Sequence, residues 1–103
     1  MCIRDRYFGS AMPDGAVSAE AWSAFLAETV TPRFPDGLTA WPASGQWRGP
    51  DGALVHEASW VLSLVHPDDP AAEAGVRAVI EAYKARFRQE AVLRVRAGAC
   101  VSL

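Results

Sequence analysis

The chain has 103 residues, of which 50% are hydrophobic and 21% are charged, and its formal net charge is −2 at pH 7. This length and composition are typical of one globular domain that buries a core without disulfide or metal support. Acidic and basic residues are interspersed, which argues against the concentrated basic face that binds nucleic-acid phosphates. No apolar run is long enough to span a bilayer. We therefore expect neither a nucleic-acid partner nor a transmembrane segment.

The first six residues, Met-Cys-Ile-Arg-Asp-Arg, resemble the translation of an adapter that is used to prepare sequencing libraries. We therefore expect residues 1–6 to be an artefact that packs against nothing, and residues 7–103 to form a single α+β domain. The natural start of the protein, with any export signal, would then lie upstream of this sequence.

The first expected elements are a short strand over residues 7–12 and a helix over residues 19–30. Ser18 precedes the helix as an N-cap residue, whose hydroxyl can accept a hydrogen bond from a backbone N–H of the first turn. Val17 and Trp22 stand at the spacing of a hydrophobic staple. Further apolar residues follow at helical spacing, so one face of this helix should pack on the core.

The centre of the chain predicts a long β-hairpin. Strands over residues 38–48 and 53–65 flank a Gly-Pro-Asp-Gly turn at residues 49–52, where proline and glycine take favoured turn positions. Pro42 cannot donate a hydrogen bond to a neighbouring strand, so the first strand should be an edge or be broken by a bulge. Gly45 favours the bulge.

The second strand of this hairpin is apolar on both faces, which is typical of a central strand that is covered on both sides. Only one layer of helices is available, so we expect the second cover to be another copy of the chain, in a homodimer built on the sheet face. The sequence leaves open which of the two alternating sets faces the partner, and it favours the set whose polar members can stay hydrated at a rim. This set consists of Val55, Glu57, Ser59, Val61, Ser63 and Val65.

A second helix is expected over residues 70–88, with Asp69 as its N-cap and Pro70 at its first position. A last strand follows over residues 91–95. The order β-α-β-β-α-β most often forms a four-stranded antiparallel sheet with two helices on one face, the ferredoxin-like plait. The residues expected between helices and sheet are Trp22, Phe25, Leu26, Val76, Val79, Ile80, Tyr83 and Leu93.

Five stretches are distinctive when they are taken together. They are Thr-Pro-Arg-Phe-Pro-Asp-Gly-Leu-Thr (31–39), Gly-Gln-Trp-Arg-Gly-Pro-Asp-Gly (45–52), Leu-Val-His-Pro-Asp (64–68), Tyr-Lys-Ala-Arg-Phe-Arg-Gln-Glu (83–90) and Ala-Cys-Val-Ser (99–102). With them the chain resembles the bacterial domain-of-unknown-function family 3574 over residues 7–103. Members of this family are typically small exported proteins, and some are lipoproteins. The resemblance therefore implies a fold and a place in the cell envelope or outside the cell, and it implies no activity.

Cys100 is the single cysteine that remains if Cys2 is an artefact. It can be a small apolar residue beside the last strand, or it can form a disulfide with a cysteine upstream of this sequence. The family resemblance favours the disulfide, because an exported protein meets an oxidising environment. A catalytic thiol is the third reading, although no histidine neighbours Cys100 in the sequence.

The candidate site residues lie on the central hairpin. Glu57 and Ser59 share one face of its second strand, where a part-buried carboxylate can have a shifted pKa and act as a base. The alternatives are that Glu57 is a surface carboxylate, or that it forms an ion pair with Arg48 or with Arg94 on a neighbouring strand.

Gln46, Trp47 and Arg48 can present an amide, a ring and a guanidinium to a ligand, or they can form a cross-strand packing unit. His56 and His66 are too far apart along the strand to share a metal ion, and no cysteine or carboxylate stands at ligand spacing to either. The sequence contains no phosphate-binding loop and no nucleophile elbow. We therefore expect no metal site and no cofactor.

Two functions remain open from the sequence. The first is a non-catalytic cell-envelope domain that binds a partner or dimerises through its open sheet face. The second is a small cofactor-free enzyme of the dimeric α+β barrel type, similar in architecture to monooxygenases, with Glu57, Trp47 or His56 in a cavity between helices and sheet. An enclosed pocket lined by these side chains would favour the enzyme. A filled core beneath a flat apolar sheet face would favour the binding domain.

Overall fold

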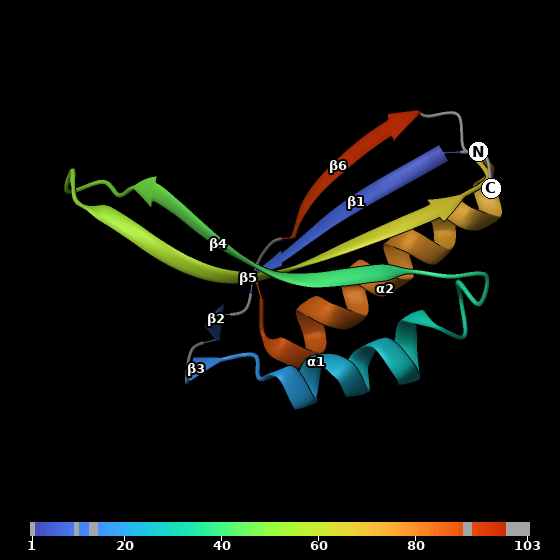
Figure 1. Cartoon of the computed structure of the whole chain (residues 1–103), viewed down its shortest axis with the longest axis horizontal. Helices are drawn as coiled ribbons and strands as arrows, with labels where there is room; N and C mark the ends of the chain where they lie inside the picture. Colours follow the sequence, from blue (N-terminus) through green and yellow to red (C-terminus); the bar gives the residue numbers. More distant parts are fainter. Residues whose placement is uncertain (1, 10, 13–14, 90–91, 99–103) are drawn as a thin grey trace.

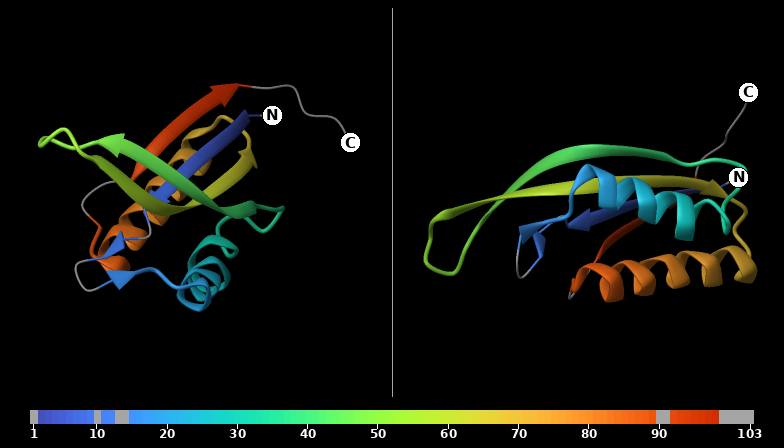
Figure 2. Two further views of the ribbon diagram at one scale, coloured as in Figure 1. Left: turned by 60° about the vertical axis from the view of Figure 1, so that its left-hand side comes forward. Right: turned by 90° about the horizontal axis from the view of Figure 1, so that it is seen from below.

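The computed structural model describes residues 2–9, 11–12, 15–89 and 92–98 of the chain. Two helices lie side by side on one face of an antiparallel sheet, so the predicted α+β fold is confirmed (Figures 1 and 2). The elements are, in chain order, β1 (Cys2–Gly9), β2 (Ala11–Met12), β3 (Gly15–Ala16), α1 (Ala19–Phe25), the π-helical segment η1 (Leu26–Val30), β4 (Thr39–Arg48), β5 (Leu54–His66), α2 (Pro70–Phe87) and β6 (Leu93–Gly98).

The main sheet has the strand order β4-β5-β1-β6, and each neighbouring pair runs antiparallel. β5 lies between β4 and β1, which agrees with its prediction as a central strand. The short strands β2 and β3 pair only with each other. The last strand begins at Leu93 and continues to Gly98, so it lies further along the chain than predicted.

The start of the chain corrects one expectation. Residues 2–6 belong to β1, which pairs with β5 from Cys2 opposite His66 to Gly9 opposite Ser59. The prediction that these residues pack against nothing is therefore wrong. Since β4 occupies only one edge of β5, the other edge needs a partner strand, and β1 supplies it. The proposed adapter origin of residues 1–6 stays a prediction.

The first helix begins and continues as predicted. The Ser18 hydroxyl accepts a hydrogen bond from the backbone N–H of Ala21 at 3.1 Å, which satisfies one free donor of the first turn. Val17 and Trp22 are both buried, as the hydrophobic staple predicted. The last turn is π-helical, with the N–H of Thr31 donating to the Leu26 carbonyl at 2.9 Å.

The second helix is capped at both ends. The Asp69 carboxylate accepts from the backbone N–H of Ala72 at 2.8 Å, and Pro70 takes the first helical position. The helix ends at Arg88, which has a left-handed conformation with φ of 53°. Both features agree with the expected boundaries.

The hairpin between β4 and β5 turns at residues 49–52, as predicted. The N–H of Gly52 donates to the Gly49 carbonyl at 3.0 Å, and Gly52 has a φ of 84°, which a residue with a side chain rarely adopts. The predicted bulge at Gly45 is absent, because the pairing of β4 with β5 continues through Gly45 opposite Glu57 without a register shift. Pro42 is accommodated because β4 is an edge strand.

The core lies between the helices and the sheet. Most predicted core residues are buried there, and Leu26 and Ile80 pack partly buried at its margin. Leu93 is the exception, because it is 65% exposed. Its neighbour Arg94 takes the helix-facing side of β6 instead, where its guanidinium binds Glu73 of α2 at 2.6 and 2.5 Å. The buried cluster consists of Val17, Trp22, Phe25, Val30, Phe34, Leu62, Leu64, Val76, Val79, Tyr83 and Phe87.

The face of the sheet that turns away from the helices is called the open face below. Leu62 and Leu64 lie in the core, so the alternate residues of β5 lie on the open face. The set that faces outward is therefore the one that the sequence favoured without deciding between the two. Large apolar side chains remain exposed on this face, namely Trp41, Trp47, Val55, Val65, Leu93 and Val95.

Candidate functional site

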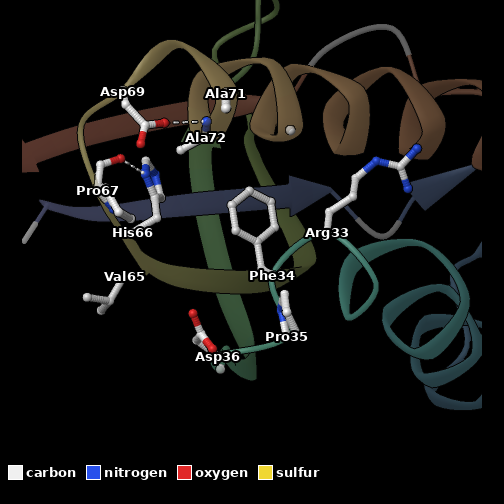
Figure 3. A pocket seen from close by; sticks show the side chains of 12 residues that line it. Arg33, Phe34, Pro35, Asp36, Val65, His66, Pro67, Asp69, Ala71 and Ala72 are labelled. Atoms are coloured by element: carbon white, nitrogen blue, oxygen red, sulfur yellow. Dashed lines mark hydrogen bonds between the residues drawn. The ribbon is translucent and has the colours of Figure 1, made fainter.

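A pocket of about 270 Å³ lies where the connector after η1 meets the end of β5 and the first turns of α2 (Figure 3). Its volume lies just below the roughly 300–1,000 Å³ that is usual for small-molecule sites. A ligand of nucleoside size would therefore be only partly enclosed. The residues that line it are Arg33, Phe34, Pro35, Asp36, Gly37, Val65, His66, Pro67, Asp69, Ala71, Ala72 and Gly75.

Phe34 forms one wall of the pocket. The backbone N–H groups of Arg33 and Phe34 both donate to the Val30 carbonyl, at 3.0 and 2.9 Å, and so hold the connector against the end of the helix. The Phe34 ring also lies against Gly75 of α2, since a Cβ at Gly75 would stand 3.2 Å from Cζ of the ring. The glycine therefore gives the ring room to lie close to the helix.

His66 is the most unusual side chain of the pocket, because it is only 4% exposed and incompletely bonded. Its Nδ1 lies 2.8 Å from the Pro67 carbonyl oxygen. A carbonyl oxygen only accepts hydrogen bonds, so Nδ1 of the neutral ring carries the hydrogen and Nε2 presents a lone pair. Within the described part of the chain Nε2 has no hydrogen-bond partner. Nε2 is therefore an unsatisfied acceptor that is itself shielded from solvent.

The charges around the pocket favour a cationic or neutral ligand. Asp36 and Asp69 contribute carboxylates to its lining. The guanidinium of Arg33 donates to the Thr29 carbonyl at 2.9 Å and points away from the other labelled side chains (Figure 3). Carboxylates at a cleft raise the local concentration of cations.

An ion pair between Arg94 and Glu73 lies away from the pocket, between α2 and β6. The two hydrogen bonds from Arg94 lower the pKa of Glu73 to about 2, against the opposing effect of burial. In the core between the helices and the sheet, burial raises the pKa of the Tyr83 hydroxyl, and the negative charge of Glu57 raises it further. Arg94 therefore pairs with Glu73 and not with Glu57, for which it was one of two alternative partners.

The open face brings three predicted site residues together. Trp47, Glu57 and Ser59 all point to the side of the sheet opposite the helices, with Glu57 and Ser59 half-buried. They therefore do not form the cavity between helices and sheet that the enzyme hypothesis required. None of the three lines the pocket.

The other predicted site residues lie elsewhere on the hairpin. Gln46 and His56 are exposed and stand opposite each other on the helix-facing side. The Arg48 guanidinium donates to the Gly52 carbonyl at 2.8 Å, so it stabilises the turn. Cys100, which was considered for a disulfide, lies outside the described residues.

Sequence reasoning missed the pocket. His66 was interpreted as a strand-end residue and Phe34 as a core anchor. The available signal was the alternation of β5, which places His66 on the same side as Leu62 and Leu64 and so predicts that its ring is buried. Two of the stretches that carry the family resemblance, residues 31–39 and 64–68, line most of the pocket.

Among the residues that the structure describes, no group of three His, Cys, Asp or Glu side chains is placed to hold a metal ion. In the same described ranges, no helix is both long and apolar enough to cross a membrane.

The fold resembles solved structures of a phage enzyme. A phage SAM lyase in complex with S-methyl-5′-thioadenosine superposes with a TM-score of 0.70 at 15% identity, covering 94% of this chain and 81% of that one. A phage SAM lyase in the apo state gives a TM-score of 0.65 at 15% identity, covering 99% and 92%. No curated protein matches the chain.

These likenesses correct the first functional hypothesis. Both of these solved structures are of an enzyme, so they give no support to the interpretation as a non-catalytic envelope module. The family described as "Protein of unknown function (DUF3574)" matches residues 4–103. The chain therefore belongs to this family, as its distinctive stretches predicted.

Proposed function

We propose that the chain is an enzyme whose pocket at the end of β5 binds S-adenosylmethionine or a closely related nucleoside sulfonium. The observation that carries this proposal is the buried, unpaired Nε2 of His66 in a pocket with carboxylates in its lining. The fold shared with the phage SAM lyase supports the substrate class.

The chemistry of the pocket fits this substrate class. A sulfonium is a cation, and Asp36 and Asp69 offer it carboxylates. Nε2 of His66 can accept a hydrogen bond from an amine or hydroxyl group of the ligand, and the Phe34 ring provides an apolar wall for an adenine or a methylene chain. When the sulfonium is cleaved to a thioether the cation is lost, so the carboxylates favour substrate over product and promote product release.

The proposed reaction is the cleavage of the bond between sulfur and the amino-acid carbon. Nε2 of His66 takes a proton from the carbon next to the one that is bonded to sulfur. The C–H electron pair forms a carbon–carbon double bond, and the C–S pair leaves on sulfur. The products are neutral S-methyl-5′-thioadenosine and an unsaturated amino acid, and the imidazolium returns its proton to water.

The test is incubation of the purified chain with S-adenosylmethionine and chromatographic measurement of S-methyl-5′-thioadenosine. The wild type should release this product, and His66→Gln should lower the rate by about 10²–10⁴-fold, the usual contribution of a positioned base. His56→Gln is the matched control, because His56 is exposed and lies outside the pocket. If neither binding nor product is found, or if both variants lose activity equally, the proposal is wrong.

We also propose three broader features of the protein. The strand order β4-β5-β1-β6 supports a ferredoxin-like plait as the parent topology. The exposed apolar residues of the open face support a homodimer as the working form. The family resemblance supports export to the cell envelope. Fractionation of cells that express the full-length gene tests the last of these.

A further inference from the structure

The open face carries a large exposed apolar surface. Trp41, Trp47 and Leu93 are 43%, 50% and 65% exposed, and Val55, Val65 and Val95 are also exposed on this face. At roughly 200 Å² for each large side chain, the exposed apolar surface of this face is on the order of 500 Å². This is near the upper end of the ~300–600 Å² found for the largest patch of a typical soluble monomer.

The tip of the β4–β5 hairpin extends this face beyond the body of the molecule (Figure 1). Pairing of β1 with β5 ends at Gly9 opposite Ser59, so residues 54–58 pair with β4 alone. We call residues 44–58 the hairpin arm. A two-stranded ribbon by itself is only marginally stable in water. The arm therefore needs a partner surface, and Trp47 and Val55 supply its apolar contact on the open face.

We propose that a second copy of this chain docks on the open face, with Trp41 and Trp47 as its two main points of contact. This inference rests on the homodimer proposed above and specifies its geometry. A standard interface buries about 800 Å² per partner, and homodimer interfaces are about 65% apolar. An apolar share of about 65% of 800 Å² is about 520 Å², which is close to the exposed apolar area of about 500 Å² on the open face.

The charge of the open face selects a second copy over other partners. Among its described side chains on β4, β5 and β6, Glu57 carries the only charge. Membrane surfaces and nucleic acids are bound by lysine and arginine, which this set of side chains does not present. A two-fold axis lets one apolar patch meet its own copy, so no second complementary surface is needed.

The residue sizes along β4 define how the two copies meet. Ala43 and Gly45 lie between Trp41 and Trp47, and a Cβ at Gly45 would contact only the Glu57 carbonyl oxygen, at 3.7 Å. A partner that rests on the two indole rings therefore leaves a hollow above Ala43 and Gly45. Glu57 stands beside this hollow and keeps its hydration, which removes the cost of burying a carboxylate in an apolar interface.

The test is sedimentation equilibrium of the full chain without substrate, so its outcome does not depend on the proposed reaction. The wild type should have twice the mass of one chain at micromolar concentration. Trp47→Asp should weaken association at least about tenfold, since one charge is placed on the interface of each copy. Leu54→Asp is the matched control, because Leu54 is 53% exposed on the arm but points to the opposite side of the sheet.

A wild-type monomer at all concentrations, or equal loss of association in Trp47→Asp and Leu54→Asp, would overturn the proposal. Glu57→Gln tests the hollow separately. If Glu57 stays hydrated, this variant should change the dissociation constant by less than about threefold, whereas a tightening of more than about tenfold would show that the carboxylate is packed in a dry interface.

Discussion

The aromatic cluster beneath the sheet allows a quantitative test of the core. Phe25 is fully buried, and its ring centroid lies 5.4 Å from that of Tyr83, 5.7 Å from Phe87 and 5.8 Å from Trp22. Phe25→Ala removes the ring from all three contacts and leaves a cavity between α1, α2 and the sheet. We expect the free energy of unfolding to fall by about 3–5 kcal/mol, from the lost burial and the cavity together. This is a large share of the ~5–15 kcal/mol that stabilises a typical domain.

The assay is urea unfolding followed by circular dichroism, at one protein concentration for all variants because association also stabilises the fold. Leu54→Ala is the control, since more than half of Leu54 is exposed and its removal should change the free energy by no more than about 0.5 kcal/mol. A cost below about 1 kcal/mol for Phe25→Ala would refute the assignment of this helix face to the core.

Two further predictions concern charge and the pocket wall. The pKa of Glu73 falls from 4.5 to about 2 on folding, so the stability that this carboxylate contributes is complete above pH 4.5 and is lost as the pH falls towards about 2. In urea titrations over this pH range, Glu73→Gln should therefore lose less stability than the wild type. Equal losses would contradict the pairing of Glu73 with Arg94. Gly75→Ala should raise helix stability by up to about 1 kcal/mol while pushing the Phe34 ring towards the pocket, because the new Cβ would lie 3.2 Å from that ring. Calorimetric titration with S-methyl-5′-thioadenosine should then show weaker binding, and unchanged affinity would mean that Phe34 does not contact the ligand.

Local signals were sufficient to place most helices and turns. Ser18 and Asp69 each accept the backbone hydrogen bond that their positions predicted, since capping depends only on residues a few positions away. The hairpin turn closes at Gly52 for the same reason. These features need no knowledge of the rest of the fold.

The wrong expectations for β6 and for the start of β1 concern contacts between distant parts of the chain. Leu93 and Arg94 are neighbours on β6, and a strand must turn one of them to the helices. Hydrophobicity favoured Leu93 for the side that faces the helices. Arg94 takes this side instead, because its guanidinium forms two hydrogen bonds with the Glu73 carboxylate of α2. The start of β1 was missed because residues 1–6 resemble an adapter sequence and were excluded from the fold, whereas residues 2–6 pair with β5.

The pocket could not be predicted because it is assembled from distant segments. Phe34 comes from the connector, His66 from the end of β5 and Gly75 from α2. The burial of His66 follows from strand alternation, but its unpaired Nε2 depends on the position of the Pro67 carbonyl, which only the structure provides. The register of the hairpin follows from its turn, but Trp47 and Glu57 were predicted in a cavity between helices and sheet and lie on the open face instead.

The central claim is that the pocket around His66 binds a nucleoside sulfonium or its thioether product. The most direct measurement is nitrogen NMR of the chain labelled at its two histidines during titration with S-methyl-5′-thioadenosine. We predict that the Nε2 resonance of His66 shifts as its lone pair accepts a hydrogen bond from the ligand, while the resonances of the exposed His56 stay in place. If the ligand binds and His66 does not respond, or if no binding occurs, the assignment of this pocket is wrong.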